Sequence, residues 1–331
     1  AITLAGTFGM VLSAIALLYF TLEPSILKRG GVWPIYAVIF VSGIARSFIR
    51  PALTALSAEI VPRELYSNAV AWRSSSWQIA AVAGPALGGL LYGFAGAVTA
   101  YAVVTVLMAV SWITLMLIAH GGRPAPADDI AVAESLRIGL RFLWNQPVVL
   151  AAMTLDLFSV LFGGATALLP IFAQMLRAGP EGLGALRAAP AIGSVVVGLW
   201  VAHRPPMKRA GRSLLICVAL FGLCIILFAL SRNFWLSLGL LILSGMADNV
   251  SVVIRGTMIQ LMTPHAMLGR IASVNQIFIG SSNEIGAFES GVAARLLGTV
   301  PSVIFGGCMT LVVVAMTAWL APQLRKLKRI Q

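Results

Sequence analysis

Ten runs of about twenty predominantly apolar residues follow one another along this chain of 331 residues. In helical form such a run spans about 30 Å, the thickness of the hydrocarbon core of a bilayer. Hydrophobic residues make up 59% of the chain and charged residues 10%, and the mean hydropathy is +0.95, well above that of soluble domains. The sequence therefore predicts an all-α membrane protein. The predicted spans are residues 1–21, 33–53, 70–93, 97–119, 148–174, 182–202, 213–231, 234–254, 271–293 and 299–321.

The positions of Lys and Arg predict how these spans are oriented, because basic residues accumulate in short cytoplasmic loops. With residue 1 on the cytoplasmic side, all but six of the 23 basic residues fall at cytoplasmic loops, span ends or the tail. Both ends of the chain are then cytoplasmic. The net charge of +12 orients the protein and attracts anionic membrane lipid, while scattered basic residues without an aromatic-lined groove do not predict nucleic-acid binding.

The residues that support covalent catalysis or metal binding are dispersed. His120, His203 and His265 lie in three separate predicted loops, so they form neither a metal site nor a Ser/His relay within the membrane. The three cysteines lie inside apolar spans, and no lysine is followed by Ser or Thr as in a phosphate-binding loop. We therefore expect no enzyme activity, no metal and no cofactor.

Matching residues recur at a constant separation of 202 positions, which predicts two parallel halves. The matches are "SGIA" at Ser42 with "SGMA" at Ser244, Pro62 with Pro264, Gly89 with Gly291, and Gly96 with Gly298. Applied to spans 148–174 and 182–202, the same offset predicts two helices before residue 1 and twelve spans in the full protein. The predicted organisation is a first half at 1–119, a cytoplasmic linker at 120–147 and a six-helix half with a basic tail at 148–331.

The linker contains a predicted amphipathic helix. Its polar and apolar side chains alternate at spacings of three and four residues, which places them on different helix faces. The polar positions are Glu134, Arg137, Arg141 and Asn145, and the apolar positions are Leu136, Leu140 and Leu143. We expect this helix to lie on the cytoplasmic surface, with a flexible linker as the alternative.

Two motifs carry a resemblance to a known family. One is Gly84-Pro85-x-x-Gly88-Gly89 in span 70–93, preceded by Ala80 where the family pattern has a further glycine. The other is a basic loop that keeps Gly198, Arg204, Arg209, Gly211 and Arg212. These resemble the antiporter motif and a decayed basic loop motif of the major facilitator superfamily, and within it of proton-driven siderophore and drug exporters. The resemblance implies two helix bundles, ten of twelve helices in this chain, and a monomer.

The glycine-proline motif has a physical interpretation. Gly84 and Gly88 offer a small face that a neighbouring helix can approach closely, and Pro85 removes a backbone hydrogen bond and bends the helix. A bend at a close contact could support alternating access to a substrate cavity. Tight packing without a hinge is the alternative.

Ionisable residues inside predicted spans indicate where transport chemistry could take place, because they are costly in lipid. Asp156 lies about eight residues into its span, or about 12 Å of helical rise, and Glu289 lies in the most polar span. A carboxylate that alternates between wet and dry surroundings can bind and release a proton. We predict Asp156 or Glu289 as the proton-coupling group, and Asn283 and Glu284 as further proton or substrate contacts. A permanently hydrogen-bonded structural role is the alternative.

Arg46 and Asp248 are also 202 residues apart, which predicts that they meet near the axis relating the two halves. The resemblance implies that the cytoplasmic ends of their two spans approach each other when the cavity faces outward. We therefore expect this pair to close a cytoplasmic gate in that state, with a headgroup contact of Arg46 as the alternative. Arg255, two helical turns after Asp248, is expected to be an interfacial anchor.

These observations predict a secondary transporter that exports a small amphiphilic or anionic molecule, siderophore-like or drug-like, by proton antiport. The alternatives are a lipid or lysolipid transporter of the same fold, and a non-transporting membrane receptor or assembly factor.

Overall fold

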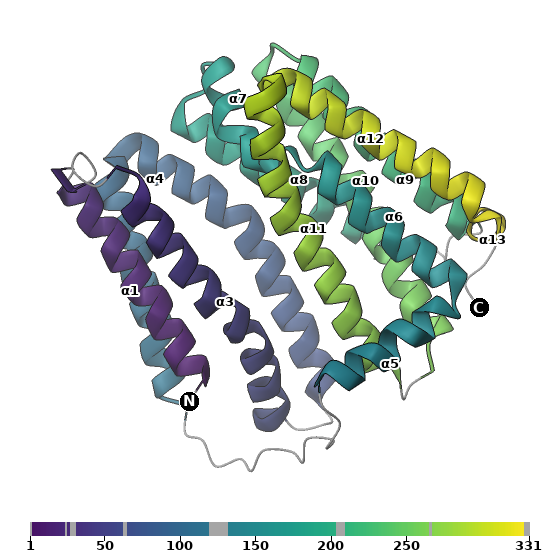
Figure 1. The fold of residues 1–331 in the computed structure, drawn as a ribbon. Helices are drawn as coiled ribbons and strands as arrows, with labels where there is room; N and C mark the ends of the chain where they lie inside the picture. The colour runs from purple at the N-terminus through teal and green to yellow at the C-terminus, as the bar shows by residue number, and fades with distance from the viewer. Residues whose placement is uncertain are drawn as a thin grey trace. The chain divides into compact units, whose positions relative to one another are not determined.

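The structure is a computed structural model that describes residues 2–23, 25–26, 31–61, 65–118, 132–202, 209–264 and 267–327. All secondary structure within these residues is helical, which confirms the predicted all-α class (Figure 1). The chain divides into two units. The first comprises Ala1–Ala80 and Leu87–Asp128, and the second comprises Ala81–Ala86 and Asp129–Gln331.

The first unit is formed mainly by three helices. These are α1 (Ile2–Leu22), α3 (Trp33–Ile60) and α4 (Tyr66–Met116). Helices α1 and α3 approach closely at Gly6, where a Cβ atom would lie 2.8 Å from the side chain of Ile49. The indole of Trp112 on α4 donates a hydrogen bond of 3.2 Å to the carbonyl of Leu4, and its ring packs on Phe8. Small residues and one long-range hydrogen bond therefore hold these helices together.

Helix α4 contains a backbone break that supports the predicted repeat. Gly96 has φ 79° and ψ 174°, and it separates the two predicted spans that α4 joins. Its counterpart Gly298, 202 residues later, has φ 91° and ψ 158° and separates α11 from α12. Only glycine adopts this region of backbone conformation readily. The same glycine-dependent corner therefore occurs at two positions that the predicted repeat pairs with each other.

The second unit contains the remaining helices. These are α5 (Val132–Trp144), α6 (Pro147–Gly163), the 3₁₀ helix η2 (Ala165–Leu168), α7 (Leu169–Met175), α8 (Gly179–Ala202), α9 (Ala210–Leu230), α10 (Phe234–Met262), α11 (Leu268–Leu297), α12 (Thr299–Leu320) and α13 (Pro322–Lys326). The single predicted span 148–174 is thus divided among α6, η2 and α7, because the helix ends at Gly163 and Gly164.

Glycines bring the long helices of this unit into backbone contact. A Cβ atom at Gly193 on α8 would overlap the carbonyl of Ile242 on α10, and one at Gly245 on α10 would overlap the carbonyl of Pro190. The side-chain amide of Asn249 also donates a 2.5 Å hydrogen bond to the carbonyl of Ser194. Close packing and internal hydrogen bonds are the means by which helices associate where no water is present.

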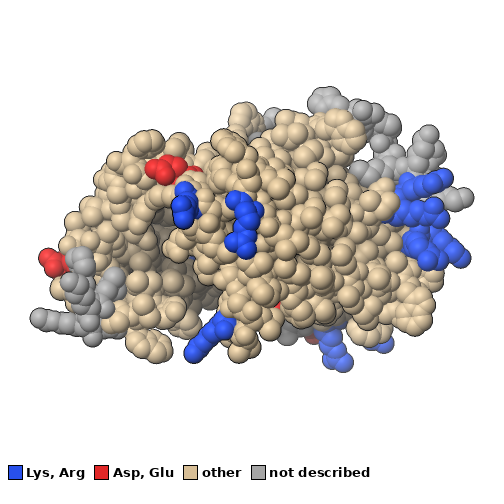
Figure 2. Space-filling view, turned by 90° about the horizontal axis from the view of Figure 1, so that it is seen from above, with Lys and Arg blue, Asp and Glu red and all other residues tan. Residues whose placement is uncertain are grey.

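Seven described helical stretches are long and apolar enough to cross a membrane. They are Thr3–Leu22, Ile79–Met116, Pro147–Met175, Gly179–Val201, Ala210–Leu230, Phe234–Met262 and Thr299–Leu320. The stretch Ile79–Met116 contains parts of two predicted spans. Helix α3 contributes only a shorter apolar segment, Trp33–Ile49. Helix α11 is long enough to cross a membrane but carries many polar residues. Most of the surface in Figure 2 is accordingly formed by uncharged residues. The count of ten spans stays a prediction.

Helix α5 is amphipathic and packs against α11 within the second unit. Leu143 is fully buried, and Gly139 lies so close to α11 that a Cβ atom would be 3.3 Å from the carbonyl of Arg270. Leu140, expected on the same apolar face, is 45% exposed, and Trp144 is 78% exposed. The helix therefore has a buried apolar face and a second, exposed apolar edge.

Candidate functional site

Three charged side chains gather inside the second unit. Asp156 lies midway along α6, and Asp248 and Arg255 lie on α10. Arg255 and Asp156 form an ion pair, with side chains that are only 4% and 9% exposed. Asp248 is within electrostatic range of both. The spacing of seven residues brings Asp248 and Arg255 onto one face of α10, so a single helix face supplies two charges to the partner helix.

A small cavity joins the two carboxylates. It has a volume of about 10 Å³ and is lined by Asp156, Asp248, Ser159 and Ser251, together with three apolar residues. The hydroxyls of Ser159 and Ser251 are buried and have no hydrogen-bond partner among the described residues. A cavity of this size holds about one water molecule, which is stable only where several polar groups surround it. The polar lining fits such a water between the two acids.

The charges of this cluster do not balance when all three groups are ionised. Two carboxylates and one guanidinium sum to minus one, and an uncompensated charge away from water costs several kcal/mol. Binding one proton makes the cluster neutral. The arrangement can hold one exchangeable proton.

Arg255 was not expected in this site, and the prediction that it is an interfacial anchor is wrong. The residue is 3% exposed and paired with Asp156. The predicted span ended at residue 254, but α10 continues to Met262 and so places Arg255 inside the packed part of the helix. The sequence did contain a signal for this site. Arg255 follows Asp248 by seven residues, and a serine follows each acid by three residues, at Ser159 and Ser251.

The polar residues predicted on α11 lie apart from the cluster. Its buried face is formed by Ile271, Val274, Ser282, Gly286 and Ser290. Asn283 and Glu284 are exposed and Glu289 is partly exposed. The amide of Asn283 donates a 2.8 Å hydrogen bond to the carbonyl of Ile279 in its own helix. Within the described residues, these three side chains do not join Asp156.

The predicted gate would connect the two units. Asp248 has Asp156 and Arg255 as charged neighbours within the second unit, and Arg46 is exposed on α3 in the first. A contact between Arg46 and Asp248 therefore stays a prediction.

The glycine-proline motif lies within α4, which runs through Pro85. Cβ atoms at Gly84 and Gly88 would have no described atom within 4 Å, and the non-helical residue of α4 is Gly96. The close approach and hinge proposed for Gly84, Pro85, Gly88 and Gly89 stay predictions.

The basic loop motif is described except for Arg204, which lies outside the described residues. Gly198 lies on α8, and Arg209 precedes α9. Gly211 is buried in the first turn of α9, followed by the exposed Arg212. A Cβ atom at Gly211 would overlap the carbonyl of Leu324, so this glycine allows α13 to pack against α9.

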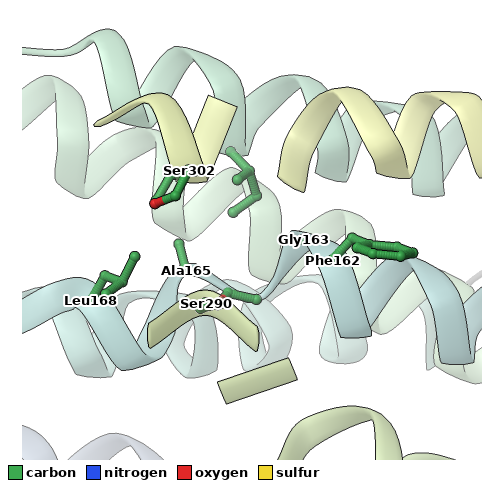
Figure 3. Close-up of a pocket in the computed structure, with 9 residues that line it drawn as sticks. Phe162, Gly163, Ala165, Leu168, Ser290 and Ser302 are labelled. Atoms are coloured by element: carbon green, nitrogen blue, oxygen red, sulfur yellow. The ribbon is translucent and has the colours of Figure 1, made fainter. Parts of the chain in front are cut away.

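A second small cavity lies where α6 ends (Figure 3). Its volume is also about 10 Å³, and Ser290 and Ser302 contribute polar side chains to its lining from α11 and α12. Ser290 donates a 3.2 Å hydrogen bond to the carbonyl of Gly164, which stabilises the break between α6 and η2. Room for about one water excludes a substrate here.

Apolar helices of spanning length, packed through glycines around buried charges, define a polytopic membrane protein. The chain belongs to the Major Facilitator Superfamily, whose family model matches residues 4–287, and it is accordingly a membrane transporter. It is similar to the enterobactin exporter EntS of Escherichia coli O1:K1, with 27% identity over 326 residues, covering 98% of this chain and 76% of the relative. The enterobactin exporter EntS of Shigella boydii serotype 18 gives the same values.

Proposed function

We propose that the protein exports a small amphiphilic or anionic molecule, siderophore-like or drug-like, across a bacterial inner membrane in exchange for protons. The observation that carries this proposal is the buried cluster of Asp156, Arg255 and Asp248 around a water-sized cavity. The family supports transport of a small molecule, and the similarity to an enterobactin exporter supports an outward direction.

The cluster couples protons to transport through its charge balance. With one proton bound it is neutral and stable in a closed, dry environment. When the cavity opens to water, the proton leaves and the negative charge is solvated. Proton binding thus favours one conformation and proton release the other, which is the thermodynamic requirement for coupled transport.

The remaining predicted residues act around this cluster. Glu284, Glu289 and Asn283 contact substrate or a second proton from the accessible side of α11. Gly84, Pro85, Gly88 and Gly89 allow α4 to move in alternating access, and Arg46 with Asp248 closes the cytoplasmic side. Both ends of the chain are cytoplasmic, the protein acts as a monomer, and the basic loop from Gly198 to Arg212 lies on the same side.

Efflux from membrane vesicles with an imposed pH gradient tests the proposal. A panel of catechol-containing siderophores and lipophilic dyes is compared for the parent protein, Asp156→Asn and Glu289→Gln. Glu134→Gln, which removes an exposed acid on α5, is the matched control. We expect gradient-dependent efflux that is lost in Asp156→Asn and kept in the control. Efflux that persists in Asp156→Asn and without a gradient contradicts proton coupling at this cluster.

A further inference from the structure

An open apolar groove lies on the second unit, separate from the charged cluster. It has a volume of about 590 Å³ and runs between α6 and α12, ending at α5 and α13. Phe158 and Leu150 line one side, Met316 and Leu320 line the other, and Trp144 and Gln323 stand at the end. It shares no lining residue with the cavity between Asp156 and Asp248. The groove is therefore a distinct surface feature.

The size and lining of the groove fit a flexible apolar ligand. Pockets that hold small molecules have volumes of about 300–1,000 Å³ and are mostly apolar. Here the polar lining side chains are Thr154, Thr317 and Gln323. The walls belong to α6 and α12, which are long and apolar enough to cross the bilayer. The apolar molecule always present beside such helices is a lipid acyl chain.

Positive charge is concentrated at one end of the groove. Arg141 lies one helical turn before Trp144 on α5, and Arg325 and Lys326 lie in the last turn of α13, two and three residues after Gln323. All three basic side chains are exposed, and neither α13 nor the last turn of α5 contains an acidic residue. Figure 2 shows several Lys and Arg side chains gathered at the side where Figure 1 draws α13. An apolar slot with a basic end is complementary to an anionic lipid.

We propose that this groove binds an anionic phospholipid of the surrounding bilayer, with one acyl chain between α6 and α12 and the headgroup phosphate against Arg141, Arg325 and Lys326. The exposed Trp144 ring lies at the junction of the two parts, where an aromatic residue suits the boundary between hydrocarbon and headgroup. Bound in this way, the lipid links the linker helix α5 to the C-terminal helix α13. The site is independent of proton coupling.

Quenching of Trp144 fluorescence by brominated lipids tests the site. The purified protein is reconstituted into vesicles with brominated phosphatidylglycerol or brominated phosphatidylcholine, and the signal of Trp144→Phe is subtracted to isolate Trp144. We expect phosphatidylglycerol to quench Trp144 at lower mole fraction than phosphatidylcholine. Each basic residue near a membrane surface contributes about fivefold to the binding of anionic lipid. The triple variant Arg141→Gln, Arg325→Gln, Lys326→Gln therefore loses up to about 100-fold of this preference.

Two further variants separate the headgroup from the acyl chain. Arg232→Gln removes an exposed charge at the opposite end of α9 from α13 and keeps the preference. Thr317→Phe fills the groove without adding a second tryptophan, and it lowers the quenching of Trp144 by both lipids while the basic residues remain. Equal quenching by the two headgroups in the parent protein overturns the proposal. So does an absence of quenching, which would mean that protein covers the groove.

Discussion

The charge balance of the cluster predicts how its stability responds to substitution. In Asp156→Asn, Arg255 loses its ion-pair partner but still has the carboxylate of Asp248 within electrostatic range, so the charges of the cluster sum to zero without any proton. In Asp156→Asn combined with Asp248→Asn, the guanidinium is buried without a counter-ion. Removing the partner of a buried charge costs about 3–5 kcal/mol. The double variant is therefore far less stable than the single one, although both exchange a carboxylate for an amide of the same size.

The assay is thermal unfolding of the purified protein in detergent. At about 2 °C per kcal/mol for a large chain, the double variant loses about 6–10 °C in Tm. Adding Arg255→Met removes the unpaired charge and recovers most of this loss, because the remaining amides are neutral and no buried charge then lacks a counter-ion. A triple variant as unstable as the double variant would refute the charge-balance reasoning and indicate a loss of packing instead.

Three predictions concern the fold. Gly245→Ala forces a Cβ atom into the carbonyl of Pro190 and lowers the free energy of unfolding by about 1–3 kcal/mol, measured by thermal unfolding. The control Gly239→Ala, on the same helix, places its Cβ atom in open space and does not lower the stability. Gly298→Ala places a side chain at a residue with φ 91° and lowers the free energy of unfolding by about 1–3 kcal/mol. An unchanged Tm would contradict the glycine-dependent corner between α11 and α12. Asn233→Ala removes the cap whose Oδ1 accepts from the backbone of Trp235 at 2.8 Å, which costs about 1 kcal/mol, and Asn233→Ser recovers most of it.

The helices of the second unit could be predicted closely from sequence because apolar runs and loop residues mark their ends. The predicted span 299–321 corresponds to the observed helix Thr299–Leu320, and the predicted span 213–231 corresponds to Ala210–Leu230. Hydropathy fails where a helix continues past its apolar part. Helix α10 runs to Met262 although the apolar run ends near residue 254, and this extension buries Arg255.

The site was only partly predictable for a related reason. Depth within a span identified Asp156, and helical spacing related Asp248 to Arg255. Which helices pack against each other depends on backbone contacts such as those at Gly193 and Gly306, which a single sequence does not reveal. The partner of Asp156 therefore emerged only from the structure.

Paired transport assays in proteoliposomes test whether Asp156, Arg255 and Asp248 together bind the coupling proton. One assay measures uphill transport driven by a pH gradient, and the other measures exchange of labelled for unlabelled substrate without a gradient. We expect Asp156→Asn to lose uphill transport but keep exchange, because the neutral cluster still allows conformational change. Equal loss of both activities, or uphill transport at the parent rate, would contradict it.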